Sequence, residues 1–464
     1  MSWEPVIGLE IHIHLKTRTK MFCRCPVLYV ETPNTQTCPV CLAHPGALPV
    51  PNEKAVEWTI LLGHALGCEV PDRAIFHRKN YFYPDNPKGY QISQYDSPLC
   101  VNGRFVVPGP DGDAVVGIER AHLEEDAAKT IHVGGAEGRI HGADRSLIDF
   151  NRAGTPLVEI VTAPDIRSAD DAKSFLQLLR QTVVELGISD AEMEKGSLRF
   201  DVNVSVRPAG TDELRTRTEL KNMNSFNFAA KGIEREVRRQ AEIYDAGGQV
   251  EQETLHFGSE SAPPLRSKEE AQDYRYFPEP DLVPLEPDRD LVERLRATLP
   301  EAPAARIRRL EDEVGFVLAE GLVTSGRDEL YSGIPGERGA VANVVMNELA
   351  ATGVDPASVN AKELAKVIER RTEIPRSAFT EALAASGSPD FSADRYLAEA
   401  AIADVSELDP VIERILSENE SQVEAYRGGK EGLLGFFVGQ VMKETGGKAN
   451  PKVVSDRLRE KLEA

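Results

Sequence analysis

The chain has 464 residues, of which 41% are hydrophobic and 28% charged, so it can build packed cores and its length suits about three domains. Its 54 Lys and Arg against 75 Asp and Glu give a net charge of −21, which disfavours nucleic-acid binding by the whole surface but leaves room for a local basic patch. No apolar run approaches the roughly 18–20 residues of a transmembrane helix and no signal-peptide pattern opens the chain, so we expect a cytoplasmic protein without a membrane partner.

The first predicted strand covers residues 7–15, where every odd position is aliphatic and Glu10, His12 and His14 occupy even positions. Because a strand alternates its faces, these three side chains share the face opposite the core. Alternate residues lie about 6.6–6.8 Å apart along a strand, so Glu10 and His12 can converge on one metal ion. The alternative is an ordinary solvated face of an antiparallel sheet.

Two close cysteine pairs follow this strand, and their spacing is typical of a closed tetrahedral zinc site. The first pair is C-x-C, which is tighter than the usual C-x₂-C, and the second is C-P-V-C. Four sulfur ligands leave no open position, so we expect a structural Zn²⁺ rather than a catalytic one. The alternative is four unrelated reduced thiols. The predicted ligands are Cys23, Cys25, Cys38 and Cys41.

Two segments, residues 78–91 and 273–278, mix aromatic side chains with cations among turn residues. Aromatic faces can stack nucleic-acid bases and lysine can meet phosphate, which favours a nucleotide or nucleic-acid ligand. The alternative is that the aromatic residues beside proline only anchor the packing.

Carboxylates also appear in or beside two further predicted strands. Glu159 lies in the apolar run 156–161, typical of a buried strand, where a charged group needs a partner or a metal ion. Glu124, Glu125 and Asp126 follow a strand-like stretch over residues 115–123, and a solvated turn is the alternative reading of these three. A polar sheet face is also predicted for residues 198–207, and the alternation continues over residues 215–221.

The C-terminal part is predicted to be helical. Residues 278–287 contain four prolines and no glycine, which indicates an extended linker. Beyond it, apolar residues recur with helical spacing, and a last apolar stripe over 434–441 is followed by Gly446 and Gly447. Residues 199–240 and 425–464 each carry a net charge of +3 and are candidates for phosphate binding.

Several motifs are absent from the sequence. We find no G-x-x-x-x-G-K-[ST], no G-x-G-x-x-G, no G-x-S-x-G and no Ser-Ser pair. Any use of ATP therefore does without a P-loop, and an amidase built on a Ser-Ser-Lys triad is not encoded.

Taken in order, several long segments closely resemble the B subunits of the tRNA-dependent aspartyl/glutamyl amidotransferases: residues 6–12, 78–85, 123–126, 151–160, 273–281 and 435–443. The resemblance implies an α+β fold, with a cradle-shaped catalytic domain similar to glutamine synthetase and guanidino kinases. An all-helical domain and a small helical tail domain that contacts tRNA would follow. We place these domains at residues 1–287, 288–405 and 406–464.

The resemblance also implies a reaction and partners. Such proteins phosphorylate the side-chain carboxyl of Glu mischarged on tRNA(Gln), or of Asp on tRNA(Asn), using ATP and Mg²⁺. Ammonia then displaces the phosphate. It comes from glutamine cleaved in a separate amidase (glutaminase) subunit, from which it travels through a channel, while a small third subunit holds the pair together. The non-discriminating aminoacyl-tRNA synthetase is a further candidate partner.

By resemblance, the family's Mg²⁺-site and catalytic positions fall on Glu10, His12, Glu125 and Glu159. Mg²⁺ prefers oxygen ligands, so His12 would act through water. Glu125 could also take the proton from ammonium at the channel mouth. The family's zinc knuckle matches the four cysteines, with one Zn²⁺ expected per chain.

Three further assignments concern the ligands. Lys79 is expected to gate or orient the arriving ammonia, and Tyr81, Tyr83 and Arg275 are expected at the ATP or the tRNA end. Two other functions stay open from the sequence. One is a non-enzymatic, zinc-containing tRNA-binding subunit, and the other is a stand-alone ligase that uses free ammonia and a small acid.

Overall fold

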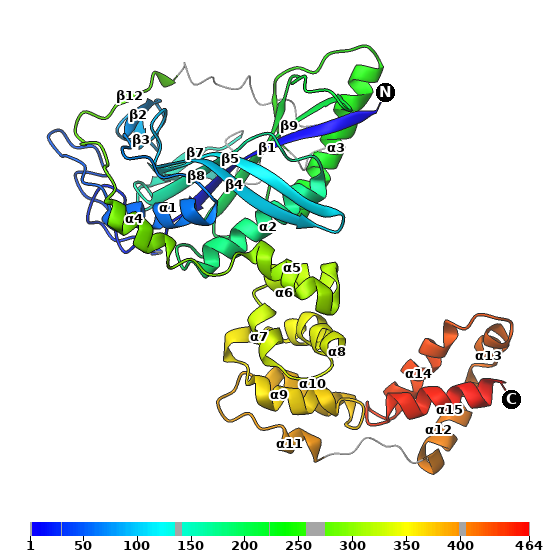
Figure 1. The fold of residues 1–464 in the computed structure, drawn as a ribbon. Helices are drawn as coiled ribbons and strands as arrows, with labels where there is room; N and C mark the ends of the chain where they lie inside the picture. The colour runs from blue at the N-terminus through cyan, green and yellow to red at the C-terminus, as the bar shows by residue number, and fades with distance from the viewer. Residues whose placement is uncertain are drawn as a thin grey trace. The chain divides into compact units, whose positions relative to one another are not determined.

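The structure, a computed structural model, describes residues 2–28, 30–134, 142–221, 223–256, 274–398 and 405–463. The chain divides into two compact units, Met1–Ala305 and Arg306–Ala464, whose elements are labelled in Figure 1. The first unit mixes a sheet with helices and the second is helical, which confirms the α+β class. The motif residue Asp273 lies outside the described residues, and the domain boundaries at 287 and 405 stay predictions.

A seven-stranded sheet forms the centre of the first unit (Figure 1). All its pairings are antiparallel except the one between the last two of its strands in chain order, residues 218–221 and 254–256. Its order in space is β11 (Thr254–His256), β10 (Thr218–Lys221), β9 (Leu198–Pro208), β1 (Trp3–His14), β8 (Pro156–Thr162), β5 (Gly112–Glu125) and β4 (Cys100–Gly109).

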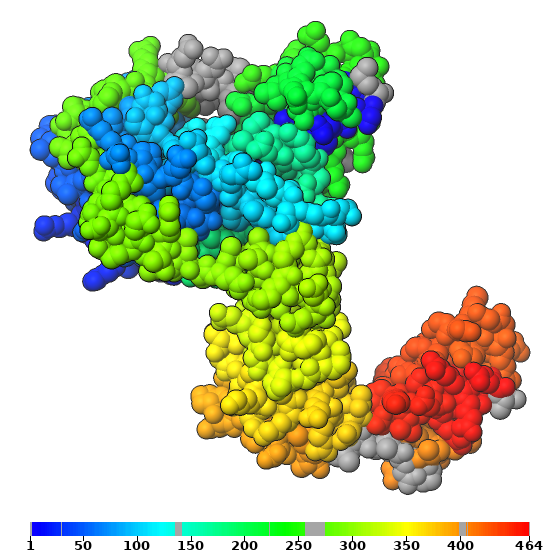
Figure 2. All heavy atoms as spheres, viewed as in Figure 1, coloured from blue at the N-terminus to red at the C-terminus, as the bar shows by residue number. Residues whose placement is uncertain are grey.

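One face of this sheet is apolar and is covered by helices. The odd residues of β1, such as Ile7, Ile11 and Ile13, are fully buried, as the alternation predicts. Burying each such side chain contributes about 1.5–3 kcal/mol. In the space-filling view, the start of β1 is seen at the surface in dark blue and the rest lies beneath later segments (Figure 2). The helices that contact the sheet are α1 (Glu53–Ala65), α2 (Ala169–Glu185) and α3 (Phe226–Asp245).

The strand register aligns polar side chains on the opposite face. His12 is directly opposite Arg199 of β9 on one side and Glu159 of β8 on the other, and Glu159 is opposite His122 of β5. These four polar residues therefore form one row across the sheet. Glu10 lies on the same face, two residues before His12 on β1. This row is the structural basis of the site.

Two sequence interpretations need correction here. The predicted polar strand over 215–221 begins only at Thr218, so Arg215 and Arg217 lie in the preceding loop. Glu124 and Glu125 do not form a solvated turn: both end β5, and both side chains are buried. The ion pairs that compensate this burial are formed with residues from other segments.

Smaller elements complete the first unit. A three-stranded sheet joins β12 (Phe277–Pro278), β2 (His77–Asn80) and β3 (Tyr90–Ser93), and a hairpin joins β6 (Lys129–Val133) to β7 (Arg145–Asp149). The proline-rich segment is not the predicted extended linker: it turns at Pro280 and Asp281, and it belongs to this unit. The backbone N–H of Leu285 donates to the carbonyl of Ala74, and α4 (Arg289–Arg296) packs on α1.

The second unit is built from short helices, as the apolar spacing predicts. Leu434 and Phe437 lie on α14, which ends before Gly446 and Gly447 in left-handed conformations. No helix in the described ranges has both the length and the apolar character needed to span a bilayer. The helices after α5 (Pro303–Val314) are α6 (Phe316–Thr324), α7 (Asp328–Gly333), α8 (Arg338–Asn343), α9 (Ala361–Glu369), α10 (Arg376–Ala385), α11 (Asp394–Leu397), α12 (Val405–Glu418), α13 (Glu420–Arg427), α14 (Leu433–Glu444) and α15 (Pro451–Glu463).

Candidate active site

An open cleft of about 1510 Å³ lies over the polar face of the large sheet. Its floor comes from β1, β5, β8, β9 and β10, and its walls include residues 79–95, the loop before β10 and residues 274–276. All of these segments belong to the first unit. The cleft therefore joins the predicted polar strands to part of both aromatic segments.

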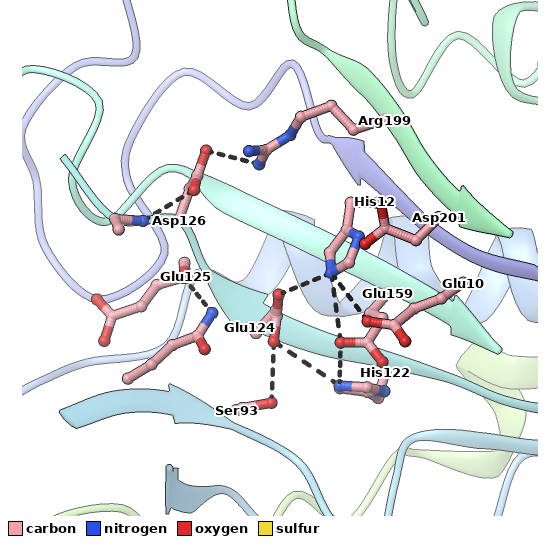
Figure 3. Close-up of polar contacts among 12 residues, drawn as sticks. Glu10, His12, Ser93, His122, Glu124, Glu125, Asp126, Glu159, Arg199 and Asp201 are labelled. Atoms are coloured by element: carbon pink, nitrogen blue, oxygen red, sulfur yellow. Dashed lines mark hydrogen bonds and ion pairs between the residues drawn. The ribbon is translucent and has the colours of Figure 1, made fainter. Parts of the chain in front are cut away.

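His12 lies at the centre of a carboxylate cluster on the cleft floor (Figure 3). Its Nε2 is 3.4 Å from Glu159 Oε2, 3.7 Å from Glu124 Oε1 and 4.0 Å from Glu10 Oε1. These groups come from β1, β8 and β5, so the fold brings three of the four predicted Mg²⁺ positions together. Glu124, which the sequence analysis did not assign to the metal, completes the cluster.

His122 belongs to the same cluster and was also missed from the sequence. Its Nε2 lies 3.6 Å from Glu159 Oε2 and 3.9 Å from Glu124 Oε2, and Arg120 Nη2 lies 3.8 Å from the other oxygen of Glu159. One oxygen atom of Glu159 thus serves both histidines. Glu10, His12 and Glu159, or His122, Glu124 and Glu159, each offer ligand atoms within 4.8 Å of one another.

The cluster holds its two histidines in different protonation states. Burial alone would lower the pKa of His12, but the carboxylates of Glu159, Glu124 and Glu10 outweigh it and raise that pKa to about 9. Burial lowers the pKa of His122 to about 4, so its ring is neutral at pH 7. Burial together with the charge of Glu159 raises the pKa of Glu124 to about 7. The crowded carboxylates therefore attract a cation, and a divalent ion suits this donor set.

Glu125 does not join this cluster, contrary to the predicted ligand set. It follows Glu124 in β5, so its side chain points to the other side of the strand and away from His12 (Figure 3). Its carboxylate forms an ion pair with Lys88 and accepts from the backbone N–H of Ile92 at 3.0 Å. In this arrangement Glu125 has a cation partner of its own.

The other predicted ligand contacts are split between two places. Lys79 and Tyr83 line the cleft, whereas Tyr81 lines a separate small pocket with Glu125. Arg275 is exposed and is not among the described residues that line the cleft. Burial alone would lower the pKa of Lys79, but Glu124 outweighs it and raises that pKa above its usual value. The ammonium group is therefore charged beside the cluster.

The far edge of the cleft, towards β10, is rich in cations. Arg215, Arg217 and Lys221 line it together with the backbone of the loop before β10. Lys221 Nζ donates to Asp201 Oδ2 at 2.9 Å, and the guanidinium of Arg215 lies over the ring of Trp3 at 5.0 Å. These cations suit a polyanionic ligand that reaches across the sheet.

The four predicted zinc ligands lie together in the same unit. The sulfur atoms of the cysteine cluster lie within 4.8 Å of one another, which suits one tetrahedral metal ion. Cys41 is buried, and the backbone N–H of Cys38 donates to its sulfur at 3.1 Å. Hydrogen bonding with Cys23 and the nearby charge of Lys20 hold the pKa of Cys41 at about 4, so a thiolate is already favoured.

Comparisons with known proteins identify the family of the chain. The GatB/GatE catalytic domain family matches residues 5–293, and the GatB domain family matches residues 338–462. A protein of Syntrophotalea carbinolica is 46% identical over 99% of this chain and 98% of its own length. One of Geotalea uraniireducens is 44% identical over 100% of both chains, and one of Thermobifida fusca is 45% identical over 99% of this chain and 94% of its own.

Each of these three relatives is named as the B subunit of an aspartyl/glutamyl-tRNA(Asn/Gln) amidotransferase. The similarity runs through both domains and over the full length, so it does not depend on one shared motif. The resemblance read from the motifs is confirmed: the chain belongs to the family of B subunits of the tRNA-dependent aspartyl/glutamyl amidotransferases.

Proposed function

We propose that this cleft activates the side-chain carboxylate of a glutamyl or aspartyl residue carried by tRNA, so that ammonia can convert it to the amide. A carboxylate is a poor acceptor for ammonia because it offers no good leaving group. Transfer of the γ-phosphoryl group of ATP to that carboxylate supplies one. The cluster of His12, Glu10, Glu124 and Glu159 on the cleft floor is the observation that carries the proposal.

The proposed reaction has two steps that balance in atoms and charge. First, an oxygen of the substrate carboxylate attacks the γ-phosphorus of ATP and ADP leaves, which gives an acyl phosphate. Second, the nitrogen of ammonia attacks the acyl carbon, phosphate leaves, and one proton departs from nitrogen. Phosphoryl transfer depends chiefly on positioning and on neutralising charge, so no nucleophilic side chain is required.

The carboxylates suit Mg²⁺ by donor chemistry. Glu10, Glu159 and Glu124 supply hard oxygen ligands, and His12 would bind directly or through water. A bound Mg²⁺ would neutralise charge on the phosphoryl group. Around it, Arg120 fixes the Glu159 carboxylate, and Lys79 offers a charged ammonium at the cleft wall.

Glu125 has a different proposed role because of its own partner. Its carboxylate lies on the other side of β5 with Lys88, beside a small pocket that also contains Tyr81. There it would take a proton from ammonium before ammonia reaches the cleft, where Lys79 would orient the nucleophile. The proton that nitrogen loses in the second step would pass to the departing phosphate. Tyr83, which lines the cleft, remains a candidate contact for ATP or the tRNA end.

The partners follow from the proposed chemistry. Ammonia would come from an amidase subunit, with a small third subunit in the same complex and misacylated tRNA(Gln) or tRNA(Asn) as substrate. The names of the relatives, which call them B subunits, support assembly with other chains. A cradle-like catalytic domain, structural Zn²⁺ and delivery by a non-discriminating synthetase belong to the same proposal.

Removing one charge from the cluster tests the proposal. In the assembled complex, Glu159→Gln is expected to reduce γ-phosphoryl transfer from ATP to Glu-tRNA by about 10²-fold or more, because one preorganised charge contributes that much. Phosphate transfer and amide formation would be measured on the same preparation. Glu234→Gln, an exposed residue on α3, is the matched control. Full activity in Glu159→Gln would contradict the proposal.

The same assay separates the two alternatives. A protein that only binds tRNA would give no ATP cleavage that depends on Glu-tRNA. A stand-alone ligase would accept free glutamate in place of Glu-tRNA. The names of the relatives, which specify an amidotransferase, disfavour the first alternative.

A further inference from the structure

Three tyrosine rings line one wall of the cleft, and two chain segments far apart in sequence supply them. The rings of Tyr95 and Tyr276 are stacked, with centroids 4.4 Å apart and an interplanar angle of 9°. Tyr274 meets Tyr276 edge-on at 6.1 Å. Tyr95 is still 45% exposed. A prearranged aromatic group that stays open to solvent in a cleft is typical of a binding surface.

A tight turn orients two of these rings. Arg275 has φ +46°, a left-handed conformation that is uncommon for a residue with a side chain. The side-chain amide of Asn80 donates to the carbonyl oxygens of Tyr274 at 3.1 Å and Arg275 at 2.8 Å. The turn leaves Arg275 exposed while Tyr274 and Tyr276 line the cleft. Strained backbone held by specific hydrogen bonds is often found at ligand sites.

A buried ion pair anchors the segment just after this turn. Nε and Nη2 of Arg78 donate to the carboxylate of Glu279, at 2.7 and 2.8 Å, and Glu279 is buried. The backbone N–H of Glu279 donates to the carbonyl of Phe76 at 2.8 Å. The rings therefore stand on a fixed base and lose little freedom when a flat ligand stacks on them.

The charges around the rings indicate the kind of ligand. Lys79 Nζ lies over the ring of Tyr274 at 4.9 Å, whereas Arg215, Arg217 and Lys221 line the β10 edge of the cleft. A triphosphate needs several cations, and a nucleobase needs ring faces. The arrangement thus favours a base at the tyrosines and phosphates elsewhere in the cleft.

We propose that Tyr95, Tyr274 and Tyr276 form an adenine-binding platform. The inference rests on the proposed function, in which two substrates carry adenine: the 3′-terminal adenosine of the aminoacyl-tRNA and ATP. Stacking of either base on the platform would hold the reacting carboxylate or phosphate beside the cluster of His12 and Glu159.

Kinetics of the assembled complex distinguish the two sources. Tyr276→Leu and Tyr95→Leu are expected to raise KM about tenfold for the substrate that stacks, with a smaller change in kcat. Tyr276→Phe keeps the ring and is the matched control, with KM near that of the wild type. Because Tyr95 is half exposed, its variant is expected to fold even if the Tyr276 variant does not.

A binding measurement without catalysis gives a second readout. Uncharged tRNA with and without its terminal adenosine is titrated into the wild-type complex and both leucine variants. If the terminal base stacks, its removal weakens binding to the wild type and has little effect on the variants. A rise in KM for ATP alone would assign the platform to the nucleotide.

The proposed platform is wrong if both leucine variants keep the wild-type KM for both substrates and still prefer tRNA with its terminal adenosine as strongly as the wild type does. Failure of the proposed function looks different, because the wild-type complex itself would then transfer no phosphoryl group.

Discussion

At the scale of single residues, two adjacent carboxylates have separate surroundings. Glu124 is buried beside His12 and His122, and Glu125 pairs with Lys88 on the other side of β5. The two residues can therefore serve different steps of one reaction, although a single peptide bond joins them.

Glu125→Gln is expected to reduce amide formation about 10²-fold or more while ATP-dependent phosphoryl transfer and glutamine cleavage in the complex continue. The reason is that ammonia must be unprotonated to attack the acyl carbon, whereas phosphoryl transfer needs no ammonia. Three rates measured on one preparation check this. An unchanged rate of amide formation would show that Glu125 is not the proton acceptor. An equal loss of phosphoryl transfer would show that Glu125 already acts in the first step.

Lys20 is a buried cation beside the cysteine cluster. Only 1% of its surface is exposed, and its Nζ donates to the carbonyls of Gln36 at 2.7 Å and Phe150 at 3.1 Å and to Cys41 Sγ at 3.7 Å. Its charge would offset that of four thiolates around a metal ion, and its hydrogen bonds tie the cysteine cluster to the chain just before β8.

We expect one Zn²⁺ per chain, and Lys20→Met is expected to weaken zinc affinity about 10–100-fold, as for other groups that support metal ligands. Elemental analysis and the rate of zinc transfer to a chelator are the measurements. Lys16→Met, which changes a half-exposed lysine on the same segment, is the control. Zinc held equally tightly by both variants would show that Lys20 has no such role.

At the scale of strands and helices, Asp126 connects three segments. It directly follows β5, and its Oδ2 lies 2.7 Å from His14 Nε2 on β1 and 3.1 Å from Arg199 Nη2 on β9, with Arg152 Nε at 3.3 Å. Burial alone would raise the pKa of Asp126, but these partners hold it well below its usual range.

Asp126→Asn is expected to lower the free energy of unfolding by about 1.5–3 kcal/mol at pH 7, because it removes a buried carboxylate charge that is hydrogen-bonded to Arg199 and paired with Arg152. A depressed pKa stabilises the fold above the ordinary value of 3.8, and the stabilisation is lost as pH falls below it. Urea unfolding at pH 7 and pH 3.5 checks both effects. The account is wrong if the difference in unfolding free energy between the variant and the wild type grows at low pH.

The alternation of residues predicted much of this arrangement. It placed Glu10 and His12 on one face of β1, and the apolar surroundings of Glu159 indicated a charge that needs a partner. His122 lay inside the predicted strand over residues 115–123 but was given no role, and Glu124 was missed because that strand stopped at Leu123. If the strand is extended to residue 125, the same alternation places Glu124 on the face of His122 and Glu125 on the opposite face.

The pairing of strands could not be predicted from the sequence. His12, His122, Glu159 and Arg199 form one row only because β1 lies between β8 and β9, and those pairings join distant segments. Local alternation fixes the face on which a residue lies, but not its neighbour across the sheet. The tyrosine platform is likewise assembled from distant segments.

At the scale of the whole molecule, charge is unevenly distributed. The chain carries −21 overall, yet residues 425–464 hold eight Lys and Arg against five Asp and Glu, a net charge of +3. Their helices share a core with α12, including Leu408, Phe437 and Leu458. The basic stretch over residues 425–464 could bind phosphates although α12 and the chain as a whole are acidic.

Deleting residues 406–464 is expected to weaken tRNA binding and to flatten its salt dependence, while the first unit keeps its own sheet and stays folded. Binding measured at several salt concentrations, with circular dichroism as the folding check, tests this. The double variant Lys443→Gln and Lys448→Gln changes two exposed lysines and keeps the tail. Undiminished affinity after the deletion would contradict the prediction.

The position of β1 has a consequence for biosynthesis. This strand leaves the ribosome before its partners, which begin only at Pro156 and Leu198. During translation its apolar residues must therefore wait, unpaired, until both later strands emerge. A nascent chain of this kind is open to aggregation and suited to protection by a chaperone.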